Sequence, residues 1–231
     1  MINSTNRPPK PAMTRDLHRS YGRVQGRKLS PNQERLVASN LPQIAFTPEQ
    51  LKGKDNVCLE IGFGKGEHLA QYAMRNPDTF FIGCEPFING VARLLQYIKD
   101  DNIENIRIFH GDARMLLESI DNNILDKVFI LFPDPWPKVK HHKKRIINDK
   151  MLELLAKKLK YNAILEVATD HVDYGDKIAE HLDNSELFQE SEITKNKRET
   201  PPHDWIPTNY QQKAEKQGRP ARFFNFINKF Q

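Results

Sequence analysis

The segment from Phe129 to Lys138 holds the residue types best placed to do chemistry in this chain. It reads Phe-Ile-Leu-Phe-Pro-Asp-Pro-Trp-Pro-Lys, an apolar run of strand length that ends in Asp134 between two prolines. Because proline cannot continue a central strand, the strand must end at Phe132 or Pro133 and present Asp134 at its carboxyl tip. Ligands bind beyond this edge in open parallel sheets. The basic stretch 138–145 follows, so an acid, an aromatic and several cations converge where a nucleic acid could meet a bound cofactor.

Three other carboxylates occupy equivalent places, each at or near the end of a predicted strand. Glu60 precedes the turn Gly62-Phe63-Gly64-Lys65-Gly66, whose glycines let a ligand approach the backbone closely, and the helix behind the turn offers N–H groups. Glu85 ends the next strand and could accept hydrogen bonds from both hydroxyls of a ribose. Asp112 follows the third strand and could bind an adenine amino group. Together with Asp134, these acids predict a ligand site along one edge of the sheet.

Four acids predict a ligand with hydroxyls, an amine and preferably positive charge, rather than a triphosphate, and the sequence has no P-loop lysine motif. The glycine turn also departs from the dinucleotide pattern, because Glu67 and Leu69 stand where its third glycine is needed. Both observations tell against a nucleotide triphosphate or NAD. They favour S-adenosylmethionine, which carries a ribose, an adenine, an α-amino group and a sulfonium.

Alternating strand and helix patterns must position these residues. The hydrophobic spacing predicts strands over 56–61, 79–85, 106–110, 127–132 and 163–169, with helices over 68–75, 88–99, about 113–119, through 151–159 and near 174–182. Pro31 could open a short helix before them. Two last strands, 188–193 and 222–227, are separated by a long polar loop and a short helix. The pattern predicts an α/β fold with a doubly wound, mostly parallel sheet and the last pair joining antiparallel at one edge.

The chain has 231 residues and a formal net charge of +5, and the excess positive charge lies at its N-terminus. Residues 1–36 hold eight Lys or Arg against two acids, so we expect a basic, flexible arm there and a single domain over 37–231. Such arms commonly contact phosphate backbones, although a solvated tail has the same composition. Without an apolar membrane span or a signal-peptide core, the chain is expected to be cytoplasmic.

The ordered motifs resemble the bacterial tRNA (guanine-N7)-methyltransferase family, whose fold is the Rossmann-like class I methyltransferase sheet. The resemblance covers most of residues 50–231. It rests on the following stretches: Leu59-Glu60-Ile61-Gly62-Phe63-Gly64-Lys65-Gly66, Gly83-Cys84-Glu85-Pro86, Gly111-Asp112-Ala113, Phe132-Pro133-Asp134-Pro135-Trp136-Pro137-Lys138 with His142-Lys143-Lys144-Arg145, and Ala168-Thr169-Asp170-His171. The proline-rich element is the most specific of them, whereas many methyltransferases share the glycine turn.

The resemblance implies roles for individual residues. Asp134 matches the family's proposed catalytic position. The implied cofactor-binding positions are Glu60, Gly62, Gly64, Gly66, Glu85, Asp112, Ala113 and Asp134, and the implied substrate-binding positions are Lys138, Asp170, Thr208, Asn209, Tyr210 and Gln211. The family's C-terminal motif usually ends in glutamate where Gln211 stands. Glutamine can still hydrogen-bond a guanine edge but supplies no negative charge, and Glu215 one helical turn away could compensate.

The implied reaction is transfer of a methyl group from S-adenosylmethionine to N7 of a guanosine in tRNA, with the variable loop suggested by the family. One alternative is methylation of an exocyclic amine, because Asp134-Pro135-Trp136 is similar to an element that grips such nitrogens. A second alternative is a catalytically silent RNA-binding module, which S-adenosylmethionine binding would argue against. Adjacent His141 and His142 in a lysine-rich run give weak grounds for a metal, so none is expected. A monomer and a homodimer both remain open.

Overall fold

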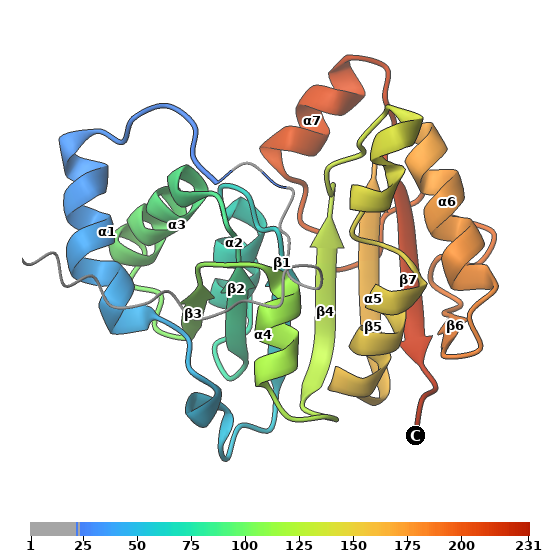
Figure 1. Ribbon diagram of the computed structural model, residues 1–231, viewed down its shortest axis with the longest axis horizontal. Coiled ribbons are helices and arrows are strands. Elements are labelled where there is room, and N and C mark those ends of the chain that lie inside the picture. Colours follow the sequence, from blue (N-terminus) through green and yellow to red (C-terminus); the bar gives the residue numbers. More distant parts are fainter. Residues whose placement is uncertain (1–21, 23) are drawn as a thin grey trace, which may run out of the picture.

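The computed structural model describes Gly22 and residues 24–231, which form one sheet with helices on both of its faces (Figure 1). The strand order is β3-β2-β1-β4-β5-β7-β6. These strands are β1 (Val57–Ile61), β2 (Phe80–Cys84), β3 (Ile106–Phe109), β4 (Leu125–Leu131), β5 (Leu159–Thr169), β6 (Phe188–Glu190) and β7 (Arg222–Asn228). The first five run parallel, and β7 lies antiparallel between β5 and β6. The sequence-based fold class is therefore confirmed.

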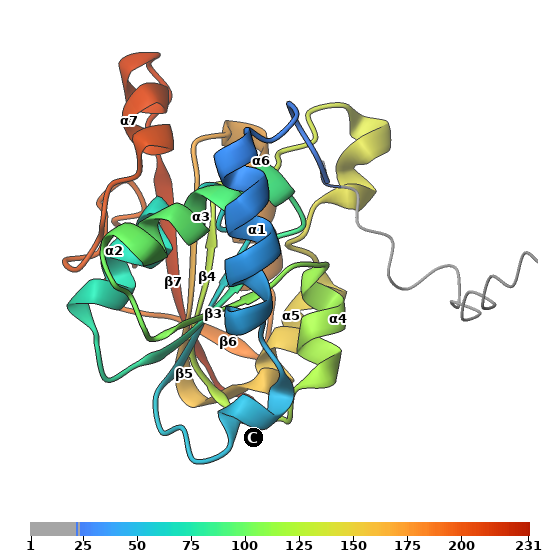
Figure 2. The same cartoon turned by 90° about the vertical axis from the view of Figure 1, so that its left-hand side faces the viewer.

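The helices divide between the two faces of the sheet (Figure 2). Buried side chains of α2 (Glu67–Arg75) and α3 (Ile88–Asp100) pack in one cluster with β2 and β3, and Leu36 of α1 (Pro31–Ile44) joins them. The opposite cluster contains buried side chains of α4 (Ala113–Ser119), α5 (Asp149–Lys158) and α6 (Val172–Asp183). Two short 3₁₀ helices, η1 (Pro48–Leu51) and η2 (Val139–Lys144), and the C-terminal α7 (Asn209–Lys216) complete the described chain. None of the described helices combines the length and apolarity that a bilayer crossing needs.

Three elements differ in length from the sequence-based expectation. Helix α1 is longer than expected, because the Ser30 and Gln33 side chains form a capping box at its start and it continues through Pro42 to Ile44. Strand β5 begins at Leu159, which was expected in a helix, and a register shift against β4 hid its first residues from a simple alternation pattern. Strand β6 ends at Glu190 rather than at residue 193.

The division into a basic arm and one domain stays a prediction. Helix α1 begins at Pro31 and packs against α3, so the helix crosses the boundary that the sequence placed after Leu36. Most of the arm, including Arg19 and Arg23, lies outside the described residues. Its described end is docked, because Asn89 at the start of α3 accepts from the Gly26 N–H at 2.8 Å and donates to the Arg27 carbonyl at 2.7 Å.

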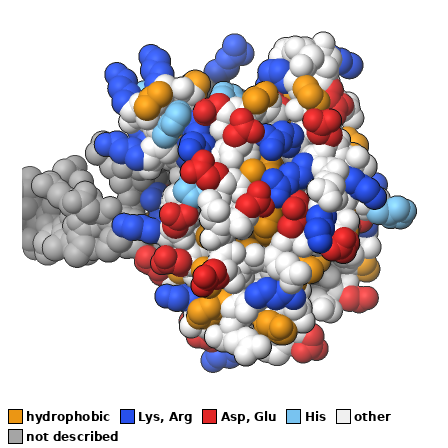
Figure 3. All heavy atoms as spheres, turned by 90° about the vertical axis from the view of Figure 1, so that its right-hand side faces the viewer, with side chains coloured by type: hydrophobic (Ala, Val, Ile, Leu, Met, Phe, Trp, Pro, Cys, Tyr) orange, Lys and Arg blue, Asp and Glu red, His pale blue; other side chains and the backbone are white. Residues whose placement is uncertain are grey.

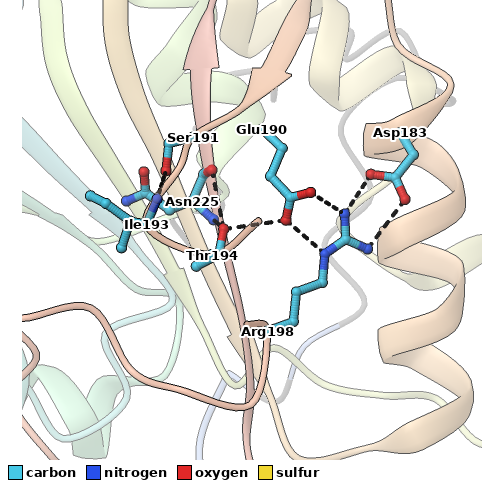
Figure 4. Close-up of polar contacts among 7 residues, drawn as sticks. All are labelled: Asp183, Glu190, Ser191, Ile193, Thr194, Arg198 and Asn225. Atoms are coloured by element: carbon cyan, nitrogen blue, oxygen red, sulfur yellow. Dashed lines mark hydrogen bonds and ion pairs between the residues drawn. The ribbon is translucent and has the colours of Figure 1, made fainter. Parts of the chain in front are cut away.

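Arg198 holds the long segment between β6 and α7 against the sheet (Figure 4). Its guanidinium donates to Glu190 at 2.8 and 2.9 Å and to Asp183 at 2.6 and 3.2 Å. Its backbone carbonyl accepts from the Phe223 N–H at 2.6 Å. Nearby, Thr194 contacts Glu190 and the backbone of Asn225. These contacts fasten one end of the segment that leads to α7, whose residues were predicted to bind substrate.

We expect Arg198→Met to lower the free energy of unfolding by about 1–3 kcal/mol, because it leaves two carboxylates without their shared partner. The matched control is Lys177→Met, which removes a cation from an exposed pair with Glu180 and is expected to change the same quantity by about 0.5 kcal/mol or less. Urea denaturation of both variants measures the difference. Equal effects would show that Arg198 contributes no more than a surface ion pair.

Candidate active site

The turn after β1 has the backbone conformation that a close ligand requires. Gly62, Gly64 and Gly66 have φ angles of +74°, +56° and +76°, a region that side-chain-bearing residues rarely adopt. A Cβ at Gly62 or Gly64 would meet no atom within 4 Å, so open space lies where a side chain would stand. On the other side of the turn, a Cβ at Gly90 of α3 would lie 1.9 Å from the Gly64 carbonyl oxygen. The turn is thus packed tightly from behind and left open in front.

Glu85 supports this turn from the end of β2. Its carboxylate accepts from the Gly64 N–H at 2.8 Å and from the Phe87 N–H at 2.9 Å. Burial raises the pKa of the Glu85 carboxyl and the nearby Asp134 and Glu60 carboxylates raise it further, whereas the two backbone N–H groups lower it. Because three acids share this space, a ligand that brings positive charge or hydrogen-bond donors would relieve their repulsion. This electrostatic setting fits the predicted S-adenosylmethionine.

A cavity of about 290 Å³ opens between the glycine turn, the end of β4 and the start of α7. Six of the residues predicted to bind cofactor or substrate line it: Glu60, Gly62, Gly64, Thr208, Asn209 and Tyr210. The cavity is also lined by Lys65, Glu67, His68 and Lys213, to which the sequence analysis assigned no binding role. Glu67 accepts from the Asn209 N–H at 3.1 Å, which ties the start of α7 to the start of α2. Two residues 142 positions apart in the sequence therefore line one cavity together.

His68 is a pocket residue that the sequence reasoning missed. Its Nδ1 lies 2.7 Å from the Glu60 carboxylate, and both side chains are almost fully buried. The ring stacks on Tyr72 and packs near Trp205, which arrives from the segment before α7. A signal did exist in the sequence: a residue in the first turn of the helix after a glycine turn points back toward the preceding strand tip. Glu60 therefore has a fixed partner on the inner side of the cavity.

Asp134 lies in an exposed loop beyond β4 and makes no hydrogen bond or ion pair with another described residue. Two residues of this loop, Phe132 and Trp136, have φ angles of +51° and +44°, which cost of order 1–3 kcal/mol each for residues with side chains. Burial raises the pKa of the Tyr210 phenol and the Asp134 carboxylate raises it further, so Asp134 lies within electrostatic reach of α7. Among the described residues this carboxylate thus has no partner, and it lies near the cavity without lining it.

Asp170, at the end of β5, is held by other side chains. It forms an ion pair with Arg219 and accepts from the Tyr210 hydroxyl at 3.3 Å, and the residue is almost fully buried. The Tyr210 ring also packs against Phe132 with centroids 5.2 Å apart. Asp170 therefore connects β5 to α7 in this structure, and its predicted substrate contact would require part of this network to rearrange.

The other residues of the predicted substrate motif fall on one helix, α7, but face different ways. Thr208 caps the helix by accepting from the Gln211 N–H at 3.1 Å. The buried Gln211 amide accepts from the Trp205 indole N–H at 2.7 Å and donates to Glu215 at 2.7 Å. Both ends of this amide are thus occupied within the protein. Glutamate at this position would accept from Trp205 equally well but could not donate to Glu215.

The remaining predicted residues lie at neighbouring strand tips without lining the cavity. Asp112 caps α4 by accepting from the Arg114 N–H, and the Arg114 guanidinium also donates to it at 2.7 and 2.9 Å. Ala113 begins α4. Gly66 precedes α2, where a Cβ would lie 2.7 Å from the Leu94 side chain. Lys138 is exposed just before η2. Their binding roles stay predictions.

A larger hollow of about 940 Å³ lies beside α6, on the face shown in Figure 3. Acidic and basic side chains alternate over this face rather than gathering by sign. Arg198 is paired with Asp183, and Arg222 donates to Asp176 at 2.6 Å, so the charges that line the hollow are largely matched within the protein. This hollow is therefore a weaker candidate than the glycine-turn cavity for binding a charged ligand.

The basic stretch after Asp134 forms η2, and its side chains divide into two groups. Lys138, Lys140 and Lys143 are exposed. Arg145 is only 5% exposed, so it does not belong to the surface that was expected to follow an RNA backbone. Trp136 packs under this stretch, with the Lys144 ammonium 4.4 Å from its ring centroid. In the described part of the chain, no cluster of three or more potential ligands could hold a metal ion.

Comparisons with known proteins agree with this geometry. Residues 54–223 match the family model described as "Putative methyltransferase". A tRNA (guanine-N(7)-)-methyltransferase of Zymomonas mobilis is 41% identical over 91% of this chain and 94% of its own length. Its counterpart in a Ruegeria species is 40% identical over 89% of this chain and 86% of its own length.

Two solved structures share the fold at low sequence identity. The 16S rRNA methyltransferase KamB superposes with a TM-score of 0.55 at 14% identity, covering 78% of this chain and 92% of its own. An antibiotic-related methyltransferase gives a TM-score of 0.51 at 21% identity, covering 80% and 94%. At such identities the likeness concerns the sheet and its helices alone.

We expect Gly90→Ala to weaken S-adenosylmethionine binding at least tenfold, because the new methyl group would push the Gly64 carbonyl and distort the turn. The control is Gly53→Ala, which has a φ of +73° but no atom within 4 Å of the added Cβ. It lies before β1 and is expected to lower stability without changing affinity. Calorimetric titration of both variants measures the dissociation constants. An unchanged constant in Gly90→Ala would show that the turn does not contact the ligand.

Proposed function

Because the chain belongs to the family of tRNA (guanine-N7)-methyltransferases, we propose that it methylates N7 of a guanosine in tRNA with S-adenosylmethionine as the methyl donor. The observation that carries the proposal is the exposed Asp134 carboxylate within electrostatic reach of Glu85 and Tyr210, beside a cavity whose glycine turn lies open. The full-length similarity to curated enzymes of this activity supports it, as does the cluster of acids at successive strand tips.

The reaction requires alignment of guanine N7 with the methyl group of the donor, and it does not require a strong catalytic base. Guanine N7 carries an in-plane lone pair and no hydrogen, so it can attack without losing a proton first. When bound, the donor supplies a methyl group on a sulfonium: the N–C bond forms as the C–S bond breaks, its electron pair stays on sulfur, and the positive charge passes to the purine. The protein must therefore hold the base in line and stabilise the charge that develops on it.

We assign recognition of the guanine base to the Asp134 side chain. Its carboxylate can accept hydrogen bonds from guanine N1–H and the exocyclic amine, which fixes the base and stabilises its growing positive charge. Asp170 could do the same by chemistry, but Arg219 and Tyr210 already occupy it. We assign Glu60, which lines the cavity, and Glu85, which supports its glycine turn, to the donor, because carboxylates favour a cationic ligand. The Tyr210 and Phe132 rings pack against each other in the wall of the same cavity.

We assign binding of the tRNA backbone to three exposed lysines in and just before η2: Lys138, Lys140 and Lys143. They lie directly after the Asp134 loop, so phosphates that they bind would be close to the reacting base. The basic arm would add a second backbone contact. By family resemblance the modified guanosine lies in the variable loop, and the reaction takes place in the cytoplasm.

Methylation of an exocyclic amine is the second candidate, and it predicts a different product. Such an amine must lose a proton during the reaction, whereas N7 does not. A silent RNA-binding module would bind tRNA without transferring a methyl group. Incubation with labelled S-adenosylmethionine and unmodified tRNA, followed by cleavage selective for N7-methylguanosine, separates all three.

We expect Asp134→Asn to reduce the single-turnover rate of methyl transfer by about 10²- to 10³-fold, because the amide cannot supply the negative charge that the transition state needs. Its thermal unfolding should stay close to that of the wild type, since Asp134 is exposed and unpaired. Glu180→Gln removes an exposed acid from α6 and serves as the matched control. Full activity in Asp134→Asn would remove Asp134 from the mechanism.

We expect the double variant Lys140→Ala/Lys143→Ala to bind tRNA more weakly and to lower the slope of log affinity against log salt by roughly 1 to 2. The transfer rate at saturating tRNA should change little, because phosphate contacts position the RNA rather than act on the base. Lys52→Ala, an exposed lysine before β1, is the control. Filter binding at several salt concentrations measures the slope, and an unchanged slope would exclude this surface as a backbone contact.

A further inference from the structure

We propose that Arg145 is a positioning residue that holds the Asp134 loop in its reactive conformation, rather than an RNA contact. The inference rests on the proposed role of Asp134. Arg145 is the last residue of the basic stretch, and its type and place in the sequence group it with the exposed lysines. The structure separates it from them, because its side chain is 5% exposed while Lys140 and Lys143 are open to solvent.

The loop that carries Asp134, residues 133–137, has no backbone hydrogen bonds among the described residues that would fix its conformation. Pro133, Pro135 and Pro137 remove every second N–H group from it. Among the described residues, backbone hydrogen bonds stop at the Phe132 N–H, which donates to the Ala168 carbonyl, and resume where the His141 N–H donates to the Lys138 carbonyl. Two of its residues, Phe132 and Trp136, also have positive φ angles. Such a conformation persists only where surrounding groups impose it.

Arg145 supplies the missing hydrogen bond. Its Nε donates to the Pro135 carbonyl at 2.8 Å, between Asp134 and the left-handed Trp136. Within the described chain, this is the hydrogen bond that reaches residues 133–137. The Lys144 ammonium lies 4.4 Å from the Trp136 ring centroid, and the ring centroids of His141 and Trp136 are 5.9 Å apart. Residues of one short segment therefore contact two successive residues of the loop, Pro135 and Trp136.

The other end of the guanidinium is anchored to α6. Arg145 Nη2 donates to Asp173, and the guanidinium lies 4.7 Å from the Tyr174 ring centroid. The Tyr174 hydroxyl in turn accepts from the Ile147 N–H at 3.1 Å, which fixes the chain just after Arg145. Helix α6 starts two residues after Asp170. One guanidinium thus connects the loop that carries Asp134 to the first turn of α6, which follows Asp170 in the sequence.

A lysine cannot replace this arrangement. A guanidinium presents several donors in a fixed plane, so one group can reach the Pro135 carbonyl and Asp173 together, whereas an ammonium is a single point. The Nη1 atom of Arg145 is buried and has no hydrogen-bond partner among the residues that the structure describes. Burying a charge with an unsatisfied donor costs desolvation energy and adds little to stability. This favours a role for Arg145 in fixing the geometry of the loop over one in stabilising the fold.

The test is Arg145→Lys, which keeps the charge and removes the fork. With both substrates saturating, the single-turnover rate should fall by about 10- to 100-fold, the effect of a misplacement near 1 Å. The affinity for tRNA and its salt slope should stay at wild-type values. A wild-type rate would overturn the proposal. A salt slope lowered by about 1 with an unchanged rate would instead make Arg145 a phosphate contact.

Three further variants keep the outcome decisive. Asp173→Ala removes the acceptor of the guanidinium on α6 without touching the loop, so its rate should fall in the same direction, and a wild-type rate there also overturns the proposal. The double variant Arg145→Lys/Asp173→Ala should lose less than the product of the two single losses, because both act on one contact. Lys150→Ala, an exposed lysine of α5 outside the proposed site, is the control and should keep both the rate and the salt slope.

A second readout does not depend on activity. The chain has two tryptophans, Trp136 and Trp205, so fluorotryptophan labelling gives two fluorine resonances that Trp136→Phe assigns. Arg145→Lys should shift or broaden the Trp136 resonance and leave the Trp205 resonance in place. Wild-type protein that transfers no methyl group would count against the proposed function only, whereas an unmoved Trp136 resonance would count against the role of Arg145.

Discussion

Strand β1 hydrogen-bonds to β2 on one side and to β4 on the other, both parallel to it, and this pairing determines where the acidic side chains meet. Parallel strands end at the same edge, and the strand order reverses between β1 and β4, which opens a crevice there. Glu60, paired in register with Gly83 and Phe129, lies at that reversal. The glycine turn, the Asp134 loop and α7 all meet at this crevice, so the site is a consequence of the sheet's topology.

A second set of contacts holds the C-terminal segment over the same crevice. Lys127 of β4 is mostly buried between Glu166 at 2.9 Å and Asp204 at 3.5 Å, and these carboxylates keep the pKa of its ammonium above the usual range despite the desolvation. Trp205, next to Asp204, packs against Phe223 of β7 and donates to Gln211. A buried cation on the sheet thus fixes the segment that carries the wall of the pocket.

Local sequence patterns predicted the strand tips, because prolines, glycines and apolar alternation act over a few residues. The acids that follow those tips, Asp134 among them, were found in this way. The partners that orient them were not: His68 needs Trp205 from a distant segment, and Arg145 reads as one more surface cation until its burial is known. The extension of β5 back to Leu159 was missed for a related reason, since its bulge depends on β4. Sequence thus predicted the candidate site residues, and tertiary contacts determine which of them have partners among the described residues.

The left-handed conformations of Phe132 and Trp136 bear on the entropy of substrate binding. A loop that is flexible before binding loses conformational freedom at each encounter, and that loss weakens the complex. Here the freedom is lost once, when the protein folds, because three prolines and a buried guanidinium already restrict the loop. The exposed lysines beside it keep their rotamers until RNA arrives. In the proposed function, the entropy cost of ordering side chains on binding therefore falls on the lysines assigned to the RNA backbone and not on the carboxylate assigned to the base.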